Sequence, residues 1–163
     1  MRWRWLILFL ILFSLALWSH DVRAEPVSDV TGRVVKVLPL LMDTNGAVAI
    51  SPSLFDRDAY QAFLLEHTTN DVSGIRFDVC WAAHHARGRT LIVRVELRGI
   101  GVRGLPTEAT IEQTVRPGLF RHWKSLTLAG ADYKKFGTLS AWRATLWNGK
   151  QKLGEQRSFL WSL

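Results

Sequence analysis

Three residues that commonly act as nucleophiles or metal ligands lie close together in the sequence, namely Cys80, His84 and His85. A cysteine beside a histidine can form a nucleophilic pair, and both side chains bind zinc. Neighbouring residues of a strand point to opposite faces of a sheet, so the two histidines are badly placed to share one metal ion. No further residue follows at a spacing that would orient a Cys–His pair or complete a metal site. We therefore expect a polar hairpin tip here, with no catalytic residue and no metal.

Cys80 is the single cysteine of the chain, which excludes a disulfide within the molecule. Cysteine is among the residue types that are most often buried, so we expect a buried or half-buried thiol. Pairing between two chains is the alternative. Cys80 is also the one candidate for a reactive thiol.

Two further segments resemble ligand-binding motifs. Residues 99–104 (GIGVRG) fit the G-x-G-x-x-G pattern of dinucleotide-binding proteins, which requires a helix to begin at the glycines. Residues 105–107 (LPT) lead into another strand pattern, so we expect a loop between strands and no cofactor. Residues 43–46 (DTNG) resemble the start of a calcium loop. The sixth and twelfth loop positions hold Val48 and Leu54 in place of Gly and Glu, so these residues predict a turn.

Tryptophans on an exposed face of a β-sandwich can bind sugars, because they offer flat apolar rings. Trp81 is in phase with an apolar stripe and is expected in the core. Trp147, beside the turn-forming pair Asn148-Gly149, is the best candidate for an exposed ligand-binding residue. Five tryptophans follow the N-terminal segment: Trp81, Trp123, Trp142, Trp147 and Trp161.

The N-terminus has the organisation of a secretory signal peptide. Arg2 and Arg4 precede an apolar run from Leu6 to Trp18, and residues 22–24 (VRA) have small side chains at the outer two positions. We expect cleavage before Glu25 and export to the periplasm or the medium. The alternative is an uncleaved anchor, although this run would rise only about 20 Å as a helix, less than the hydrocarbon core of a bilayer. No later apolar run is long enough to span a membrane.

The chain carries a net charge of +7, of which the segment 1–24 contributes +2. The remaining charge of +5 permits an acidic partner, such as an envelope protein or a surface polymer. The basic residues are scattered, and no nucleic-acid recognition module is visible, so we expect no nucleic-acid partner. The nearest approach to a basic patch consists of Arg87, Arg89, Arg94, Arg98 and Arg103.

The part of the chain after residue 24 reads as one domain built mainly of strands. Pro39 cannot donate a hydrogen bond to a neighbouring strand, which predicts either an edge strand or a bend there. Asn148-Gly149 predicts a tight hairpin. One helix is expected at 54–67, and a compact corner that includes a helical turn at 130–137. Strands are expected at 30–41, 47–50, 75–81, 91–98, 109–115, 123–129, 139–147 and 150–161.

The segments 75–81 and 91–98 alternate so regularly that a pairing can be predicted. With Trp81 opposite Leu91, the apolar residues share one face. Asp78 then meets Arg94 on the other face, and Arg76 meets Glu96 in the same way. This register predicts a lattice of satisfied ion pairs and no catalytic pair of carboxylates.

The stretch from Arg76 to Leu97, with Trp81 on a central strand, resembles the middle hairpin of an immunoglobulin-like domain. The corner holding Tyr133, followed by a hairpin at Asn148-Gly149, is similar to the end of such a domain. The resemblance implies a mainly β fold: a single antiparallel β-sandwich over residues 25–163 with one short helix, preceded by the signal peptide 1–24.

Immunoglobulin-like sandwiches share no common active site, so the resemblance implies no catalytic residue. We expect a non-catalytic, exported interaction or structural module of the cell envelope. The alternatives are a binding module for a glycan or anionic surface polymer, and an enzyme of unrecognised type.

Overall fold

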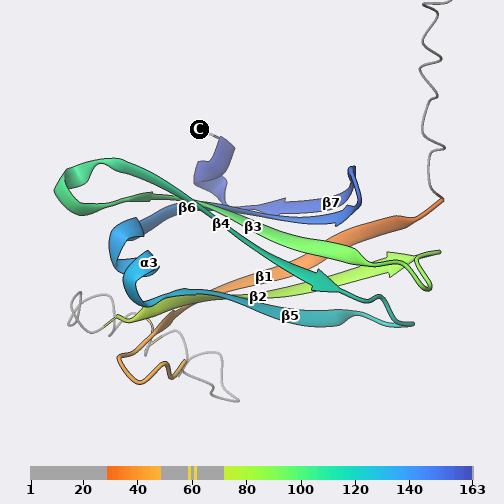
Figure 1. The fold of residues 1–163 in the computed structure, drawn as a ribbon, viewed down its shortest axis with the longest axis horizontal. Coiled ribbons are helices and arrows are strands. Elements are labelled where there is room, and N and C mark those ends of the chain that lie inside the picture. The colour runs from red at the N-terminus through yellow and green to blue at the C-terminus, as the bar shows by residue number, and fades with distance from the viewer. Residues whose placement is uncertain (1–28, 49–58, 60, 62–71, 163) are drawn as a thin grey trace, which may run out of the picture.

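The computed structural model describes residues 29–48, 59, 61 and 72–162. Its strands form two antiparallel sheets that pack face to face, as in a β-sandwich (Figure 1). The three-stranded sheet has the order β1 (Thr31–Met42), β2 (Gly74–His84) and β5 (His122–Ala129). The mainly β fold expected from the alternating patterns is therefore confirmed.

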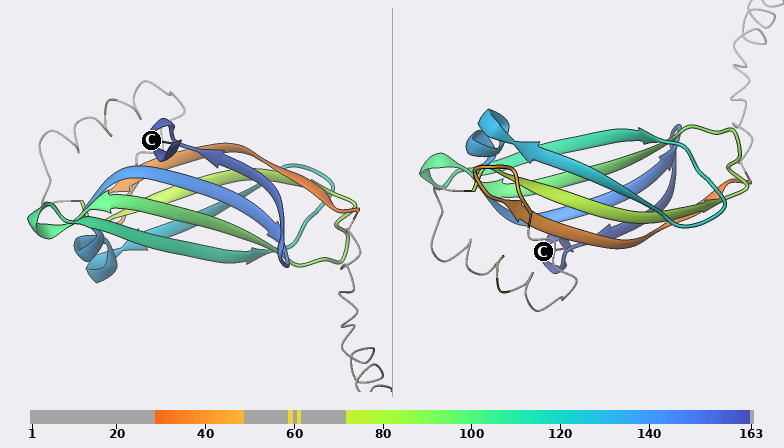
Figure 2. Two further views of the ribbon diagram at one scale, coloured as in Figure 1. Left: turned by 90° about the horizontal axis from the view of Figure 1, so that it is seen from above. Right: turned by 90° about the horizontal axis from the view of Figure 1, so that it is seen from below.

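The four-stranded sheet lies opposite the first (Figure 2). A short helix, α3 (Gly130–Phe136), follows β5 at the corner where a helical turn was expected. Two 3-10 turns, η1 (Val102–Gly104) and η2 (Phe159–Ser162), lie after β3 and β7. The strand order is β4 (Pro106–Val115), β3 (Leu91–Ile100), β6 (Thr138–Asn148) and β7 (Gln151–Arg157).

Two expected elements are only partly described. Ala47 and Val48 are not in a strand, and the rest of the expected strand 47–50 lies outside the described residues. Of the expected helix 54–67, only Ala59 and Gln61 are described, and both are helical. The expected signal peptide also lies outside the described residues. None of the helices within the described ranges is long and apolar enough to cross a membrane.

The core lies between the two sheets. Every second residue of a strand faces inward and contributes a side chain to it. Phe77 and Val79 of β2 and Val93 and Val95 of β3 are completely buried. Trp81 belongs to the same cluster and is 1% exposed, as its apolar phase predicts.

The predicted pairing of β2 with β3 is wrong. β2 pairs with β1 and β5, so Asp78 lies opposite Leu38 and Ser125, while Arg94 of β3 lies opposite Glu112 and Thr145. The two strands belong to different sheets and turn their apolar faces toward the same core. Because packing across a sandwich satisfies apolar alternation as well as lateral pairing does, the pattern alone could not separate the two arrangements. The segment 85–90 therefore crosses between sheets instead of forming a hairpin.

The edge position predicted from Pro39 is confirmed, because β1 is an outer strand of its sheet. The side-chain amide of Gln61 forms hydrogen bonds with the backbone of this strand, as a neighbouring strand would. The amide N–H of Leu41 donates to Gln61 Oε1 at 2.6 Å, and Gln61 Nε2 donates to the carbonyl of Leu41 at 3.2 Å. Covering an open edge in this way satisfies backbone groups that would otherwise invite pairing with another chain.

The turn predictions are confirmed. β6 and β7 form a hairpin whose loop residues are Gly149 and Lys150, with a positive φ of 56° at Gly149. Of residues 99–104, Gly99 and Ile100 end β3, and the others lie in the loop 101–105 between the antiparallel strands β3 and β4. Asp43 Oδ1 accepts hydrogen bonds from the backbone N–H of Asn45 at 2.9 Å and of Ala47 at 2.7 Å, which closes a turn.

Candidate functional site

The residues singled out for metal or thiol chemistry do not form a site. Cys80 is buried in β2, with 5% of its surface exposed, and lies between Lys36 and Trp123 of the neighbouring strands. His84 ends β2, and His85 follows in the connection between the sheets with a positive φ of 56°; both are exposed. No group of three or more His, Cys, Asp or Glu within the described part of the chain could hold a metal ion. The buried thiol predicted for Cys80 is confirmed.

The carboxylate of Asp78 is held by its own strand. Arg76 donates to it through Nε at 2.7 Å and Nη2 at 2.9 Å, and the hydroxyl of Ser125 donates to Oδ1 at 2.6 Å. Residues two apart on a strand share a face, which brings the arginine and the carboxylate together. Asp78 thus forms a structural ion pair, but with Arg76 and not with the predicted Arg94.

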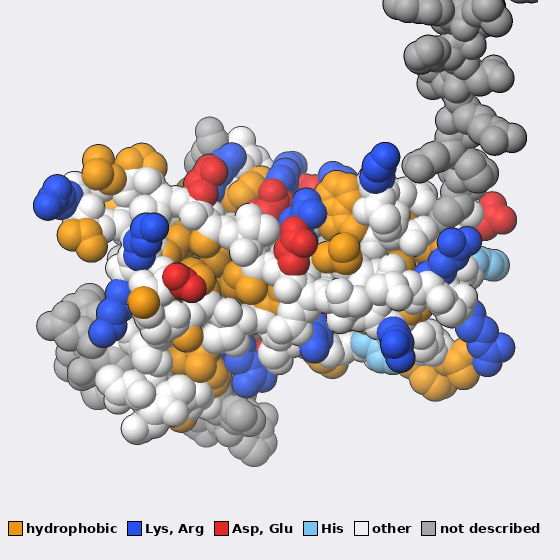
Figure 3. All heavy atoms as spheres, in the orientation of Figure 1, with side chains coloured by type: hydrophobic (Ala, Val, Ile, Leu, Met, Phe, Trp, Pro, Cys, Tyr) orange, Lys and Arg blue, Asp and Glu red, His pale blue; other side chains and the backbone are white. Residues whose placement is uncertain are grey.

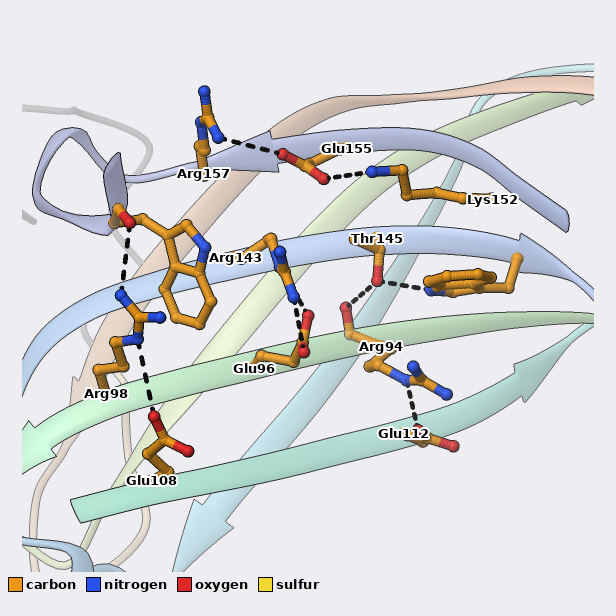
Figure 4. Close-up of polar contacts among 12 residues, drawn as sticks. Arg94, Glu96, Arg98, Glu108, Glu112, Arg143, Thr145, Lys152, Glu155 and Arg157 are labelled. Carbon is orange, nitrogen blue, oxygen red and sulfur yellow. Dashed lines mark hydrogen bonds and ion pairs between the residues drawn. The ribbon is translucent and has the colours of Figure 1, made fainter. Parts of the chain in front are cut away.

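The outer face of the four-stranded sheet carries rows of ion pairs (Figure 4). Arg143 binds Glu96 with two hydrogen bonds, of 2.7 and 2.8 Å, which raises the pKa of the guanidinium above its ordinary range. Arg94 binds Glu112, and Arg98 lies 3.8 Å from Glu108. The carboxylates on this face are therefore partnered by arginine across adjacent strands.

Glu155 on β7 lies between two cations. Lys152 Nζ donates to it at 2.8 Å, and Arg157 lies 3.7 Å away (Figure 4). The hydrogen bond from Lys152 is the main cause that lowers the pKa of Glu155, and the charges of Lys152, Arg143 and Arg157 add to it. Glu155 is consequently ionised at neutral pH.

Two tryptophans lie on this same outer face, each against arginine. The guanidinium of Arg94 is 5.1 Å from the ring centre of Trp147, whose Nε1 donates to the buried hydroxyl of Thr145 at 2.8 Å. The ring of Trp161 lies 4.2 Å from the guanidinium of Arg98. Trp147, the predicted ligand-binding residue, is half-buried and forms part of this packed layer. Trp123, which is 54% exposed, lies on the other sheet, so the tryptophans do not form one exposed row.

The remaining candidate is one end of the sandwich, which we call the loop end. It consists of the β2–β3 loop, residues 85–90, and the β4–β5 loop, residues 116–121. The pairing of Leu91 with Val115 brings the two loops to the same end of the fold. Between them lies a hollow of about 310 Å³, lined by Ala83, His84, His85, Ala86, Arg87, Pro117, Gly118 and Leu119.

The loop end combines exposed apolar side chains with uncompensated positive charge. Leu119 is 85% exposed and Phe120 is 80% exposed. Neither loop contains an aspartate or glutamate. None of its arginines takes part in an ion pair with another residue of the described ranges. The four exposed arginines are Arg87 and Arg89 on the first loop and Arg116 and Arg121 on the second.

Both loops are anchored from beneath. Ala86 is 3% exposed, and its carbonyl accepts a hydrogen bond from the N–H of Arg89 at 2.9 Å. The N–H of Gly118 donates to Nε2 of His122 at 3.0 Å, and the ring of His122 lies 5.2 Å from that of Trp81. These contacts therefore attach both loops of the loop end to the core of the sandwich.

Sequence reasoning missed this site. It grouped Arg87 and Arg89 with Arg94, Arg98 and Arg103, whereas the structure places Arg94 and Arg98 on the sheet face and Arg103 in η1. A local signal was present in residues 116–121 (RPGLFR), where a turn-forming pair precedes two large apolar residues flanked by arginines. This turn signal marks residues 116–121 as a loop, although it does not show which of their side chains are exposed.

No protein-family model matches this chain, and no curated protein matches it. A crystal structure of a protein from Akkermansia muciniphila is similar in fold, with a TM-score of 0.52. The similarity covers 85% of this chain and 78% of that chain, at 10% sequence identity. At this identity the match supports the two-sheet fold, and it carries no residue-level role.

Proposed function

We propose that this protein is a non-catalytic binding module of immunoglobulin-like type, exported to the cell envelope, which contacts an anionic partner through its loop end. Constant-type immunoglobulin domains place strands one, two, five and four in one sheet and strands three, six and seven in the other. Here six strands keep those places, and β4 joins β3 in the second sheet. The buried Trp81 also lies on the second strand, where antibody domains have it on the third.

The observation that carries the binding role is the composition of the loop end. Its two loops present four exposed arginines and contain no carboxylate, together with the largely exposed side chains of Leu119 and Phe120. The exposed Asp29, two residues before β1, is an acidic residue beside these loops. Loops at the ends of a β-sandwich vary without disturbing the core, and such sandwiches bind partners through them. Unpaired positive charge over two neighbouring loops favours an acidic partner.

A non-catalytic role is supported by the fact that the candidate carboxylates are hydrogen-bonded to arginines and the candidate thiol is buried. Asp78 and Glu96 are each held by two hydrogen bonds from an arginine, so neither is available as a general base. Cys80 is buried, whereas His84 and His85 are exposed.

The glycan-binding alternative on the tryptophan face has less support. Trp147 and Trp161 are half-buried against guanidinium groups. The charges of this face nearly cancel, because its cations are matched by Glu96, Glu108, Glu112 and Glu155. An anionic polymer would gain little there, whereas the loop end offers unbalanced charge.

The proposal is tested by the salt concentration at which the exported protein elutes from a heparin column, with heparin as a general anionic probe. We expect R116S/R121S to elute at distinctly lower salt than the wild type. The matched control K134S/K135S removes the same charge from exposed residues of α3, at the other end of the sandwich, and should elute close to the wild type. Equal shifts for the two variants would show that net charge alone governs retention and would overturn the proposal.

A further inference from the structure

We propose that the partner of the loop end is an anionic lipid bilayer, into which Leu119 and Phe120 insert. This inference rests on the proposed function and names the partner. Both side chains are more exposed than any other large apolar residue of the described chain except Phe159, and they are adjacent in the sequence. A protein surface that holds two such residues in water is suited to burying them in an apolar phase.

The arrangement of charge around the apolar pair matches the boundary of a membrane. Arg116 and Arg121 flank Leu119 and Phe120 on the same loop, so their guanidinium groups can lie at the level of the headgroups while the apolar pair goes deeper. Arg87 and Arg89 add charge from the neighbouring loop. Each arginine near an anionic surface strengthens binding by roughly fivefold.

The course of the chain places the loop end toward the membrane. Thr31, at the start of β1, pairs with His84, so β1 begins at the loop end. The apolar run Leu6–Trp18 is thus attached at this end, and residues 19–30 can span at most about 40 Å. During export, and afterwards if the leader is retained, the loop end starts within reach of the bilayer.

A lipid surface fits better than a soluble acidic polymer or protein. Leu119 and Phe120 offer no hydrogen-bonding side-chain group to a sugar or a peptide. The other exposed apolar tip, at the β3–β4 loop, holds Val102 and Leu105, but Arg103 is the one charged residue between β3 and β4. Figure 3 shows hydrophobic side chains together with Lys and Arg at both ends. At the other end Lys134 and Lys135 share the short helix α3 with Asp132, whereas the two loops of the loop end contain four arginines and no acidic residue.

Binding to vesicles tests the inference with matched apolar variants. The exported protein, confirmed by N-terminal sequencing to lack its leader, is sedimented with phosphatidylcholine vesicles that do or do not contain phosphatidylglycerol. We expect at least tenfold tighter binding to the anionic vesicles. L119S/F120S should weaken that binding at least tenfold, whereas V102S/L105S, which changes two exposed residues at the other end, should bind like the wild type.

The heparin column separates failure of this inference from failure of the proposed function. We expect L119S/F120S to elute from heparin like the wild type, which also shows that it is folded, while R116S/R121S elutes at lower salt and binds anionic vesicles more weakly. If the wild type is retained by heparin and does not bind anionic vesicles, the partner is a soluble polyanion or protein and the lipid inference is overturned. If R116S/R121S is indistinguishable from the wild type on heparin, the proposed function fails as well.

Insertion itself can be measured at one residue. Cys80 is buried, so a cysteine introduced by L119C can be labelled selectively with an environment-sensitive dye. The emission of this dye should shift to shorter wavelength on adding anionic vesicles, and the same dye at V102C should not respond. An unchanged spectrum at L119C together with tight vesicle binding would show purely electrostatic attachment, which contradicts insertion.

Discussion

Glu155 shows how a single ionisable residue contributes to the sheet face. Its native pKa is lowered, chiefly by the hydrogen bond from Lys152, while the unfolded chain titrates near the ordinary value of 4.5. A group whose pKa falls on folding stabilises the native state above its unfolded pKa. That stabilisation disappears as the pH falls through the native pKa.

We therefore expect E155Q to be less stable than the wild type at pH 7 by about 0.5 kcal/mol, a modest figure because Lys152 is half exposed. The difference should shrink as the pH falls below 4.5, because the native carboxyl becomes protonated as the pH passes its lowered pKa. Urea unfolding of both proteins at pH 7 and at a series of acidic pH values measures it. A difference that persists unchanged at acidic pH would show that the ion pair is not its source.

Trp147 tests whether the sheet face is a packed layer or a ligand platform. Its half-buried ring covers Thr145 and lies against Arg94. We expect W147A to lower the free energy of unfolding by about 2 kcal/mol, from lost apolar burial and the lost cation–π contact. Thermal unfolding measures this loss, with W147F as the conservative variant that retains most of it. An unchanged melting temperature combined with lost glycan binding would instead identify a sugar platform.

At the residue scale, the sequence predicted buried residues better than exposed ones. The burial of Trp81 could be predicted because it falls on the apolar side of an alternating strand pattern. The burial of Cys80 could be predicted because cysteine is usually buried. Leu119 and Phe120 could not be placed in the same way, because a loop has no periodicity from which to infer a face. The arginine partner of Asp78 was also mispredicted, since it depends on which strands are neighbours.

Strands β1 and β7 approach each other closely along one side of the sandwich, although they belong to different sheets. A Cβ atom at Gly154 would lie 2.7 Å from the Cα of Arg33 and 3.0 Å from the backbone nitrogen of Val34. The backbone of β1 is in the way, and it cannot yield as a flexible side chain can. Glycine at this position is therefore required by space.

We expect G154V to destabilise the protein by about 3 kcal/mol, at the upper end of what overpacking costs, and G154A to cost less. Chemical denaturation of both variants measures the order. T114V, on the exposed side of β4, is a control in which a strand residue gains β propensity without meeting another backbone. Equal stability of G154V and the wild type would mean that the two strands can separate freely.

At the element scale, strands and turns were predictable because their signals are local. The alternation in β2 and β3, the Asn148-Gly149 hairpin and the edge position of Pro39 all depend on a few consecutive residues. The partners of each strand were not predictable, because the same apolar faces satisfy pairing within a sheet and packing between sheets. Only the connection at residues 85–90, which is longer than a tight hairpin turn, pointed toward a crossing between sheets.

The molecule as a whole has two chemically different ends, and the proposed export would set its orientation through the leader. We expect the exported protein to begin at Glu25, because residues 22–24 fit the recognition of signal peptidase. N-terminal sequencing of exported material checks this. Recovery of Met1 would contradict cleavage and would leave the apolar run attached to the same end as Leu119 and Phe120.

The directions of β1 and β7 also determine how the domain would respond to mechanical force applied between its two ends. The chain enters at the loop end, and it leaves beyond Arg157, where Trp161 packs near the far end of β3. Tension between the two termini would therefore act along the strands, at right angles to the hydrogen bonds that join them. Those bonds would be loaded together in shear and not opened one after another. A domain held at both ends would therefore have to break several hydrogen bonds at once before it could unfold under force.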